Sequence, residues 1–166
     1  MRRVKLDRID LRILQDLQED GRVTNVELAR RAGISAPPCL RRVRALEEAG
    51  YIKGYHAELE AEALGYEVAF YALVGLAGQS EQVLQEFESY MKEWPEVREC
   101  SMTRGSNDFV LKLVARNTAH ENQLTGKLTA APHVATVQTI QVIRTSKSTP
   151  GVPIDDSDAT LLNGHD

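Results

Sequence analysis

The sequence is poor in the residues that identify several classes of protein. Its two cysteines, Cys39 and Cys100, are far apart and lack the close spacing of zinc sites and redox pairs, so a disulfide framework is not expected. The four histidines are scattered, and none has helical spacing from another histidine or from a cysteine. The sequence therefore predicts no metal site.

Long apolar runs and common catalytic motifs are missing as well. No apolar run approaches the roughly 18 residues that a membrane helix needs, and the chain begins with charged residues rather than the apolar stretch of a signal peptide. We therefore expect a cytoplasmic protein without membrane contacts. Because the sequence has no Gly-x-Ser-x-Gly, no phosphate loop and no dinucleotide fingerprint, we expect neither an enzyme nor a cofactor.

Charge is distributed unevenly along the 166 residues. Residues 1–55 hold 12 of the 20 Lys and Arg but only 8 of the 24 Asp and Glu, a net charge of +4, which leaves −8 for residues 56–166. Hydrophobic residues make up 42% and charged residues 27%, as in ordinary globular proteins. We interpret the chain as two small domains, of which the basic one meets a polyanion.

Two helices are predicted at the start of the basic half. Apolar residues from Leu6 to Leu17 recur at steps of three and four, which places them on one face of a first helix. The segment Asp20-Gly21-Arg22 ends it, because glycine accepts the left-handed conformation that closes many helices. Thr24 and Glu27 then have the spacing of a capping box, which predicts a short second helix.

A turn at Gly33 leads to a predicted third helix. Ser35 can cap it, and prolines are tolerated in its first turn because the N–H groups there have no intrahelical partner. Gly50 ends the helix, and Tyr51–Tyr55 is predicted as a short strand and turn, where a winged helix-turn-helix has its wing. The inward face is formed by Cys39, Val43 and Leu46.

Arg41, Arg42 and Arg44 form a dense positive strip on this third helix. A helix fits the major groove of B-DNA, where arginine can bond phosphates or the edge of guanine. The helix, glycine turn and basic helix therefore predict a domain that binds double-stranded DNA. The alternative is that these arginines are only the solvated face of a three-helix bundle.

The basic half contains a long, ordered series of motifs that resembles a known family signature. These motifs are similar to the N-terminal signature of the Lrp/AsnC family, the leucine-responsive and asparagine-operon regulators of transcription. The resemblance implies a winged helix-turn-helix in which DNA is contacted by Thr24, Asn25, Ser35, Ala36, Pro37, Pro38, Arg41, Arg42 and Arg44. The matching segments are Leu6–Leu14, Asp20–Arg22, Glu27–Ala29, Gly33–Ser35, Pro38–Leu40, Arg42-Val43, Leu46-Glu47 and Gly50–Tyr55.

The acidic half has the pattern strand, helix, strand, strand, helix, strand. Strands are predicted at about residues 68–76, 97–103, 109–115 and 134–145, with a turn at 104–107. One helix runs from Ser80 to Pro95, and Thr118 with Glu121 caps the other. This order is that of a ferredoxin-like βαββαβ domain, so the fold class is α+β. Both faces of the first strand are apolar, so helices should cover one face and a second subunit the other.

This half resembles the regulatory domain of the same family, which forms dimers and octamers and binds small effectors between dimers. Gly105, Asn107 and Asp108 are similar to its glycine-to-aspartate turn, where a carboxylate, an amide and free N–H groups suit an amino acid. The alternative is that Asn107-Asp108 only makes a good turn. By position, the resemblance adds Ser101, Met102, Thr118, Ile140, Gln141 and Val142 to the effector site.

The expected organisation is a DNA-binding domain at residues 1–55, a connector at 56–66, a regulatory domain at 67–146 and a flexible acidic tail at 147–166. We expect a DNA-binding transcription regulator that responds to a small metabolite, with an amino acid as the expected class. Two alternatives are a sirohaem decarboxylase of related fold, which would need arginine and histidine in its C-terminal cleft, and an architectural DNA-binding protein that senses nothing.

Overall fold

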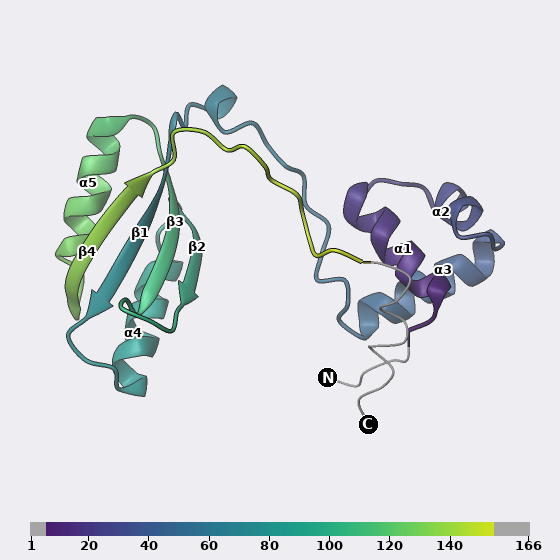
Figure 1. The fold of residues 1–166 in the computed structure, drawn as a ribbon, viewed down its shortest axis with the longest axis horizontal. Helices are drawn as coiled ribbons and strands as arrows, with labels where there is room; N and C mark the ends of the chain where they lie inside the picture. Colours follow the sequence, from purple (N-terminus) through teal and green to yellow (C-terminus); the bar gives the residue numbers. More distant parts are fainter. Residues whose placement is uncertain (1–5, 155–166) are drawn as a thin grey trace. The chain divides into compact units, whose positions relative to one another are not determined.

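The computed structural model describes residues 6–154, which form two compact units (Figure 1). The described residues up to Glu58, together with those from Lys147 onward, make the first unit, and Leu59–Ser146 makes the second. After the functions that the sequence predicts for them, we call them the DNA-binding unit and the regulatory unit. No helix among the described residues is long and apolar enough to cross a membrane, and residues 6–154 contain no cluster of His, Cys, Asp and Glu suited to a metal ion.

Three helices form the DNA-binding unit, as the sequence predicted. They are α1 (Arg8–Glu19), α2 (Asn25–Arg31) and α3 (Ala36–Glu48). Their buried apolar residues meet in one small core because each helix has an apolar stripe along one face. The buried members are Leu6, Leu11, Ile13, Leu28, Ala29, Cys39 and Leu46.

The helix caps differ in part from the prediction. The capping box of this unit lies at α1, where Asp7 and Asp10 each accept a hydrogen bond from the other's backbone N–H. At α2, Thr24 accepts from the N–H of Glu27, but the Glu27 carboxylate bonds to two arginines instead of returning to the cap. The predicted box at Thr24 is therefore only half formed.

The short strand predicted for the wing at Tyr51–Tyr55 is wrong, because no strand is assigned there. A strand needs a partner for its backbone groups, and the residues that follow are exposed and form no second strand. Tyr55 instead donates its hydroxyl proton to Glu47 of α3 at 2.9 Å, and Ile52 packs against the helical core. This segment therefore lies along the helices as extended chain.

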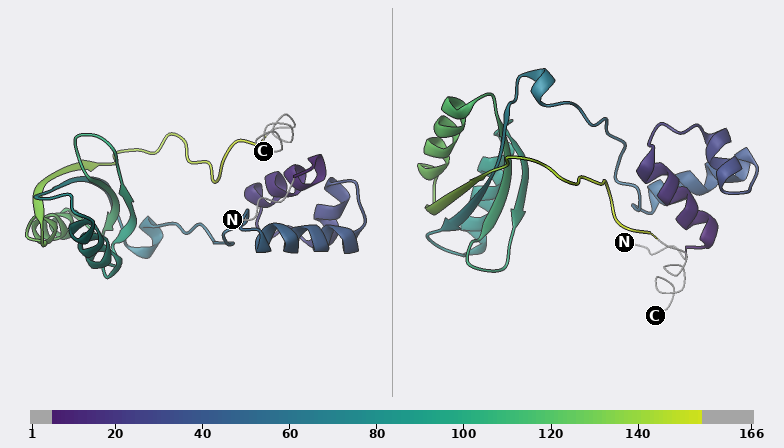
Figure 2. Two further views of the ribbon diagram at one scale, coloured as in Figure 1. Left: turned by 90° about the horizontal axis from the view of Figure 1, so that it is seen from below. Right: turned by 45° about the horizontal axis from the view of Figure 1, so that its top comes forward.

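The regulatory unit has the predicted ferredoxin-like order. Its sheet runs β2-β3-β1-β4, and all neighbouring strands are antiparallel. Both long helices cover the same face of the sheet (Figure 2). After a short 3-10 helix at Glu62–Leu64, the elements are β1 (Val68–Leu76), α4 (Glu81–Lys92), β2 (Val97–Met102), β3 (Phe109–Ala115), α5 (Thr118–Thr129) and β4 (Val134–Gln141).

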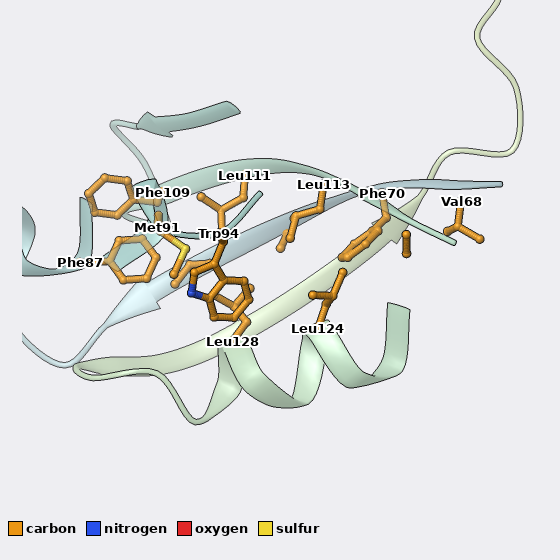
Figure 3. Packing of buried hydrophobic residues seen from close by; sticks show 13 residues of the cluster. Val68, Phe70, Phe87, Met91, Trp94, Phe109, Leu111, Leu113, Leu124 and Leu128 are labelled. Carbon is orange, nitrogen blue, oxygen red and sulfur yellow. The ribbon is translucent and has the colours of Figure 1, made fainter. Parts of the chain in front are cut away.

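Alternation along the two central strands builds the core of this unit (Figure 3). Every second residue of β1 and β3 is buried against the helices. Phe87 of α4 and Phe109 of β3 have ring centroids 4.8 Å apart, and Lys127 of α5 lies over the ring of Trp94 at 3.8 Å from the centroid. The helices are thus fixed by aromatic contacts as well as by buried area.

Two boundaries in this unit differ from the prediction. The cap of α5 is Asn117, whose side chain accepts from the N–H of His120, so Thr118 is the first helical residue and not the cap. The last strand ends at Gln141 rather than at Thr145. Its pairing stops because β1, its neighbour, begins at Val68, and Val142 donates the final bond to the carbonyl of Ala69.

The face of the sheet away from the helices is mixed: apolar residues lie along β1, Lys112 and Gln138 lie beside them, and the face is only partly covered in one chain. It carries Ala69, Tyr71 and Leu73 of β1, with Val110 of β3 beside Leu73 and Ile140 of β4 beside Tyr71. Tyr71 is 37% exposed and Ile140 is 48% exposed. We call this surface the outer sheet face.

Candidate DNA-binding and effector sites

The turn between α2 and α3 sets the start of the basic helix. Gly33 has a φ of +69°, a conformation that glycine adopts without steric cost, and the N–H of Ile34 donates to the carbonyl of Ala29 at 3.0 Å. Ser35 caps α3 through its backbone only, because its side chain makes no capping hydrogen bond. Its exposed hydroxyl is therefore available to a ligand at the start of α3.

Asn25 ties α2 to the first turn of α3. Its side-chain N–H donates to the carbonyl of Ala36 at 2.9 Å. Its side-chain oxygen is buried and, in the described part of the chain, has no hydrogen-bond partner. Asn25 was predicted to contact DNA, and the structure places it as a brace between the two helices.

The three arginines of α3 do not share one environment. Arg42 is half-buried and forms ion pairs with Asp7 at 2.8 Å and with Asp10 at 2.7 Å. The hydrogen bond to Asp10 raises the pKa of Arg42. Arg42 therefore joins α3 to α1 in the free protein.

Arg41 and Arg44 are exposed, and among residues 6–154 neither has an ion-pair partner. Pro37 is exposed as well, and Pro38 is half-buried in the first turn of the same helix. The exposed side of α3 thus presents two guanidinium groups that are unpaired within the described residues and a Ser35 hydroxyl that makes no capping bond. Such a surface can bond phosphates and base edges.

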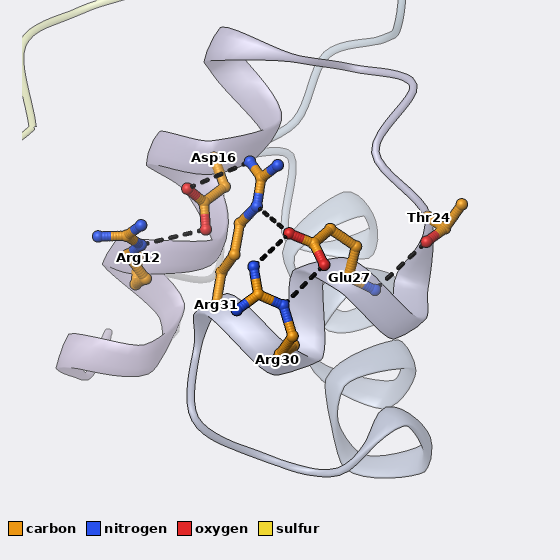
Figure 4. Close-up of polar contacts among 6 residues, drawn as sticks. All are labelled: Arg12, Asp16, Thr24, Glu27, Arg30 and Arg31. Carbon is orange, nitrogen blue, oxygen red and sulfur yellow. Dashed lines mark hydrogen bonds and ion pairs between the residues drawn. The ribbon is translucent and has the colours of Figure 1, made fainter.

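A second network holds α2 against α1 (Figure 4). Asp16 is 2% exposed and bonds to Arg12 at 3.1 Å, with Arg31 of α2 at 3.9 Å. Glu27 bonds to both Arg30 and Arg31, and hydrogen bonds from these two groups lower the pKa of Glu27 to about 2. Much of the positive charge on α1 and α2 is therefore neutralised within the unit.

In the regulatory unit, the predicted turn residue Asp108 is engaged by the protein itself. Its Oδ2 accepts from the N–H of Leu76 at 2.7 Å, and its Oδ1 accepts from the side chain of Gln79 at 2.8 Å. The turn is closed by Thr103, which donates its N–H to the carbonyl of Asp108 and its hydroxyl proton to that of Asn107. Asp108 thus fastens the β2–β3 turn to the end of β1.

A groove of about 300 Å³ lies beside this turn. Met102 and Gly105 line it together with Asp108, while Met102 is 62% exposed. Gln79, Leu84, Thr103 and Arg104, which the sequence did not assign to the effector site, complete the walls. Ser101 lies just before the groove on β2 and donates its hydroxyl proton to Glu99.

The predicted effector residues form two groups in one chain. Asp108 bonds to the carbonyl of Val74, near the end of β1, whereas Val142 bonds to that of Ala69, near its start. Five residues of strand span about 17 Å. The first group is Ser101, Met102, Gly105, Asn107 and Asp108, and the second is Thr118, Ile140, Gln141 and Val142.

Several contacts were not predicted from the sequence. Asp10 and Asp16 are the buried carboxylates of the DNA-binding unit, and each pairs with an arginine. The Asp7-x-x-Asp10 spacing and the i,i+4 spacing of Arg12 and Asp16 were available signals. No local pattern indicated that Arg42 would reach back 32 residues to Asp10.

Comparisons with known proteins agree with this division. A family model described as winged helix-turn-helix DNA-binding matches residues 6–53, and one described as the Lrp/AsnC ligand binding domain matches residues 69–152. The chain is 53% identical over 146 residues to the leucine-responsive regulatory protein of Rhizobium meliloti, covering 87% of this chain and 94% of that one. It is 36% identical to the transcriptional regulator AzlB of Bacillus subtilis, with 92% and 98% covered.

A solved structure agrees as well. The transcriptional regulator of Neisseria meningitidis in complex with L-Met matches with a TM-score of 0.84 and 32% identity, covering 89% of this chain and 96% of that one. The two domains define a transcription regulator that binds DNA through one unit and a small molecule through the other. The chain belongs to the Lrp/AsnC family.

Proposed function

We propose that the regulator reads its operator with the exposed side of α3. The observation that carries this proposal is the division of the arginines: Arg42 is paired with two carboxylates, whereas Arg41 and Arg44 are exposed and unpaired within residues 6–154. Arg41, Arg44 and the first turn of α3 from Ser35 contact DNA. Arg42, Thr24 and Asn25 hold the helices in place, with any phosphate contact from them secondary.

Two chains pair through the outer sheet face and present two α3 helices to one operator. Its apolar side chains would be buried by a second copy, and a two-fold axis predicts a pseudo-palindromic site. Dimers then assemble further, with an octamer as the expected form. The chain acts as a binding protein and not as an enzyme.

The effector is an amino acid held between chains. One chain separates the two groups of predicted residues by about 17 Å of strand, so a single site needs the β2–β3 turn of one copy and the end of β4 of another. The bound L-Met of the Neisseria meningitidis relative supports this ligand class. Because Asp108 is already bonded, backbone N–H groups and the side chain of Asn107 are left to receive the ligand.

Selection of duplexes from a randomised pool tests DNA recognition. We expect enrichment of a site with two half-sites, and Arg41→Ala or Arg44→Ala should each weaken binding about tenfold. Arg98→Ala, which removes a cation from the regulatory unit, is the control and should change affinity less than twofold. A pool without enrichment, or variants that bind like the wild type, would contradict the proposal.

Thermal melting with each of the twenty amino acids tests the effector. A ligand that binds the native state raises the melting temperature. If the site is shared between chains, Asn107→Ala and Thr118→Ala should each abolish the rise in melting temperature. In oligomers formed from an equal mixture of the two variants, about one quarter of the sites should have both residues intact and should bind the ligand again. Absence of any rise would favour an architectural protein, and mixed oligomers without recovery would place the site within one chain.

A further inference from the structure

The DNA-binding unit contains a segment from the far end of the chain. After β4, residues 147–154 belong with the three helices and not with the sheet. Figure 1 shows this segment, in yellow, ending beside α1. The chain therefore passes between the two units twice, once near Glu58 and once near Lys147. For residues 147–154 this differs from the expectation of a flexible tail without anchoring groups.

A two-point hydrogen bond fixes the segment to α1. The side-chain N–H of Gln18 donates to the carbonyl of Val152 at 2.7 Å, and its side-chain oxygen accepts from the N–H of Val152 at 2.9 Å. A carboxamide that bonds both groups of one residue replaces a neighbouring strand. It recognises backbone, so it requires a given chain geometry and not a given side chain.

Gly151 provides that geometry. Its φ is +73°, and a Cβ at this position would overlap the Gln18 carboxamide. Any other residue would be strained and would also push Gln18 away from Val152. The sequence thus has glycine where the segment makes its closest approach to α1.

The segment covers an apolar groove. The groove, of about 460 Å³, is lined by α1 residues including Leu14 and Leu17, by the chain around Ile52, and on its remaining side by Val152–Ile154 of the segment itself. Ile154 is half-buried against the same core, whereas Val152 is 63% exposed. Apolar contact at Ile154 and hydrogen bonds at Val152 therefore act together.

We propose that this groove is a docking surface for Gly151–Ile154, and that the docked segment is a strap that restrains the DNA-binding unit on the regulatory unit. The proposal rests on the proposed DNA-binding function. The strap follows Ile140–Val142, the residues at and just after the end of β4 that we assign to the effector site. A change at that end therefore has a short covalent path to α1.

The physical consequence is entropic. A unit held by one flexible connection samples many orientations, whereas a second attachment reduces them. Two restrained units lose less orientational entropy when they bind two half-sites together, because the second unit has a higher effective concentration at the second half-site. Binding to one half-site needs no such alignment, so it should not depend on the strap.

Two variants of the full chain release the strap, and each has a matched control. Gln18→Ala removes both bonds to Val152, and Gln15→Ala alters the same helix elsewhere. Gly151→Ala adds the overlapping Cβ, and Gly65→Ala adds one at a similar φ of +79°, where the nearest atom is an ordinary 3.4 Å away on Arg116. Hydrogen exchange of the Val152 N–H reports docking, and affinities for selected duplexes with one and two half-sites report its effect.

Release should speed exchange at Val152 about tenfold and weaken binding to the two-half-site duplex about tenfold, with half-site affinity within twofold. Both controls should match the wild type. The strap is contradicted if Val152 exchanges equally fast in wild type and Gln18→Ala, or if released variants bind both duplexes like the wild type. A wild-type protein that binds neither duplex contradicts DNA recognition itself, and the exchange data would still report whether the segment docks.

Discussion

The two units bury their polar and apolar groups differently. Among the described residues, the regulatory unit has thirteen buried residues in one apolar core, whereas the DNA-binding unit has seven. The smaller core is supplemented by Asp10 and Asp16, the buried carboxylates of the described chain. Apolar packing is not directional, while hydrogen-bonded ion pairs fix one geometry. The unit that must present a helix to DNA thus has the contacts that orient its helices.

The largest expected effect removes an aromatic contact from the larger core. Phe109→Ala should destabilise the regulatory unit by about 3–5 kcal/mol, because it leaves a cavity beside Phe87. Trp94 fluorescence in a denaturant titration follows this unit. The amide resonances of α1–α3 should show that these helices unfold at the same midpoint denaturant concentration as in the wild type. A parallel shift of both transitions would show that the units are not independent.

The next effect removes a carboxylate from the smaller unit. Asp10→Ala should destabilise the DNA-binding unit by about 2 kcal/mol, since Arg42 loses its shorter partner. A double-mutant cycle with Arg42→Ala should give a coupling of about 1–2 kcal/mol. Glu48→Ala on the exposed side of α3 is the control, at less than about 0.5 kcal/mol. Additive effects would mean that this ion pair does not orient α3.

Acid should loosen the DNA-binding unit first. Partial burial alone would raise the pKa of Asp7, but hydrogen bonds from the Asp10 N–H and from Arg42 outweigh it and lower the pKa below 3.8. The pKa of Glu27 is lowered to about 2. Lowered folded-state values mean that these contributions are present above the unfolded values near pH 4 and are lost as pH falls towards 2.

Amide resonances followed from pH 5 to pH 2 measure this order of loosening. The resonances of α1 and α2 should change before those of the sheet. In the regulatory unit, Glu86 has a lowered pKa through its bonds to Gln82 and His133, and it is an exposed side chain. If the resonances of the sheet changed at a higher pH than those of α1 and α2, the expectation that acid loosens the DNA-binding unit first would be contradicted.

The smallest effect is on thiol reactivity. Burial, with a contribution from Glu88, raises the pKa of Cys100 to about 11, so about one molecule in a thousand has a thiolate at pH 8. Its alkylation should be slow and should rise with pH. Cys39 is fully buried, and burial raises its pKa. Asp10→Ala should therefore speed labelling of Cys39, detected by mass spectrometry, without changing that of Cys100.

The features that could be predicted from the sequence are those that depend on residues close together in the chain, whereas contacts between distant residues could not be predicted. Alternating and helical apolar patterns predicted the helices and the sheet order, because each pattern is local. The prediction of a wing strand was wrong, because no strand is assigned at Tyr51–Tyr55 and the residues just after it form no second strand that could pair with it. Arg42 was grouped with Arg41 and Arg44, since charge alone does not show which arginine meets a carboxylate from another helix. Gln18 and Val152 lie 134 residues apart, and no local pattern joins them.

The predicted effector residues also show that positions in the sequence do not reveal distances in the folded chain. Asp108 was predicted at the turn, and its bonds to Leu76 and Gln79 come from a different strand end. The separation of Asp108 from Val142 follows from strand pairing, which only the folded chain displays. The effector residues predicted by position therefore appear as one group in the sequence and form two groups in the folded chain.

Salt dependence of operator binding tests the central division of the arginines most directly. Each phosphate contact that is lost should reduce the slope of log affinity against log salt by about one. Arg41→Ala/Arg44→Ala should therefore flatten the slope by about two, while Arg42→Ala lowers stability and leaves the slope unchanged where the protein is folded. An unchanged slope in the double variant, or a larger loss of slope in Arg42→Ala, would contradict the account.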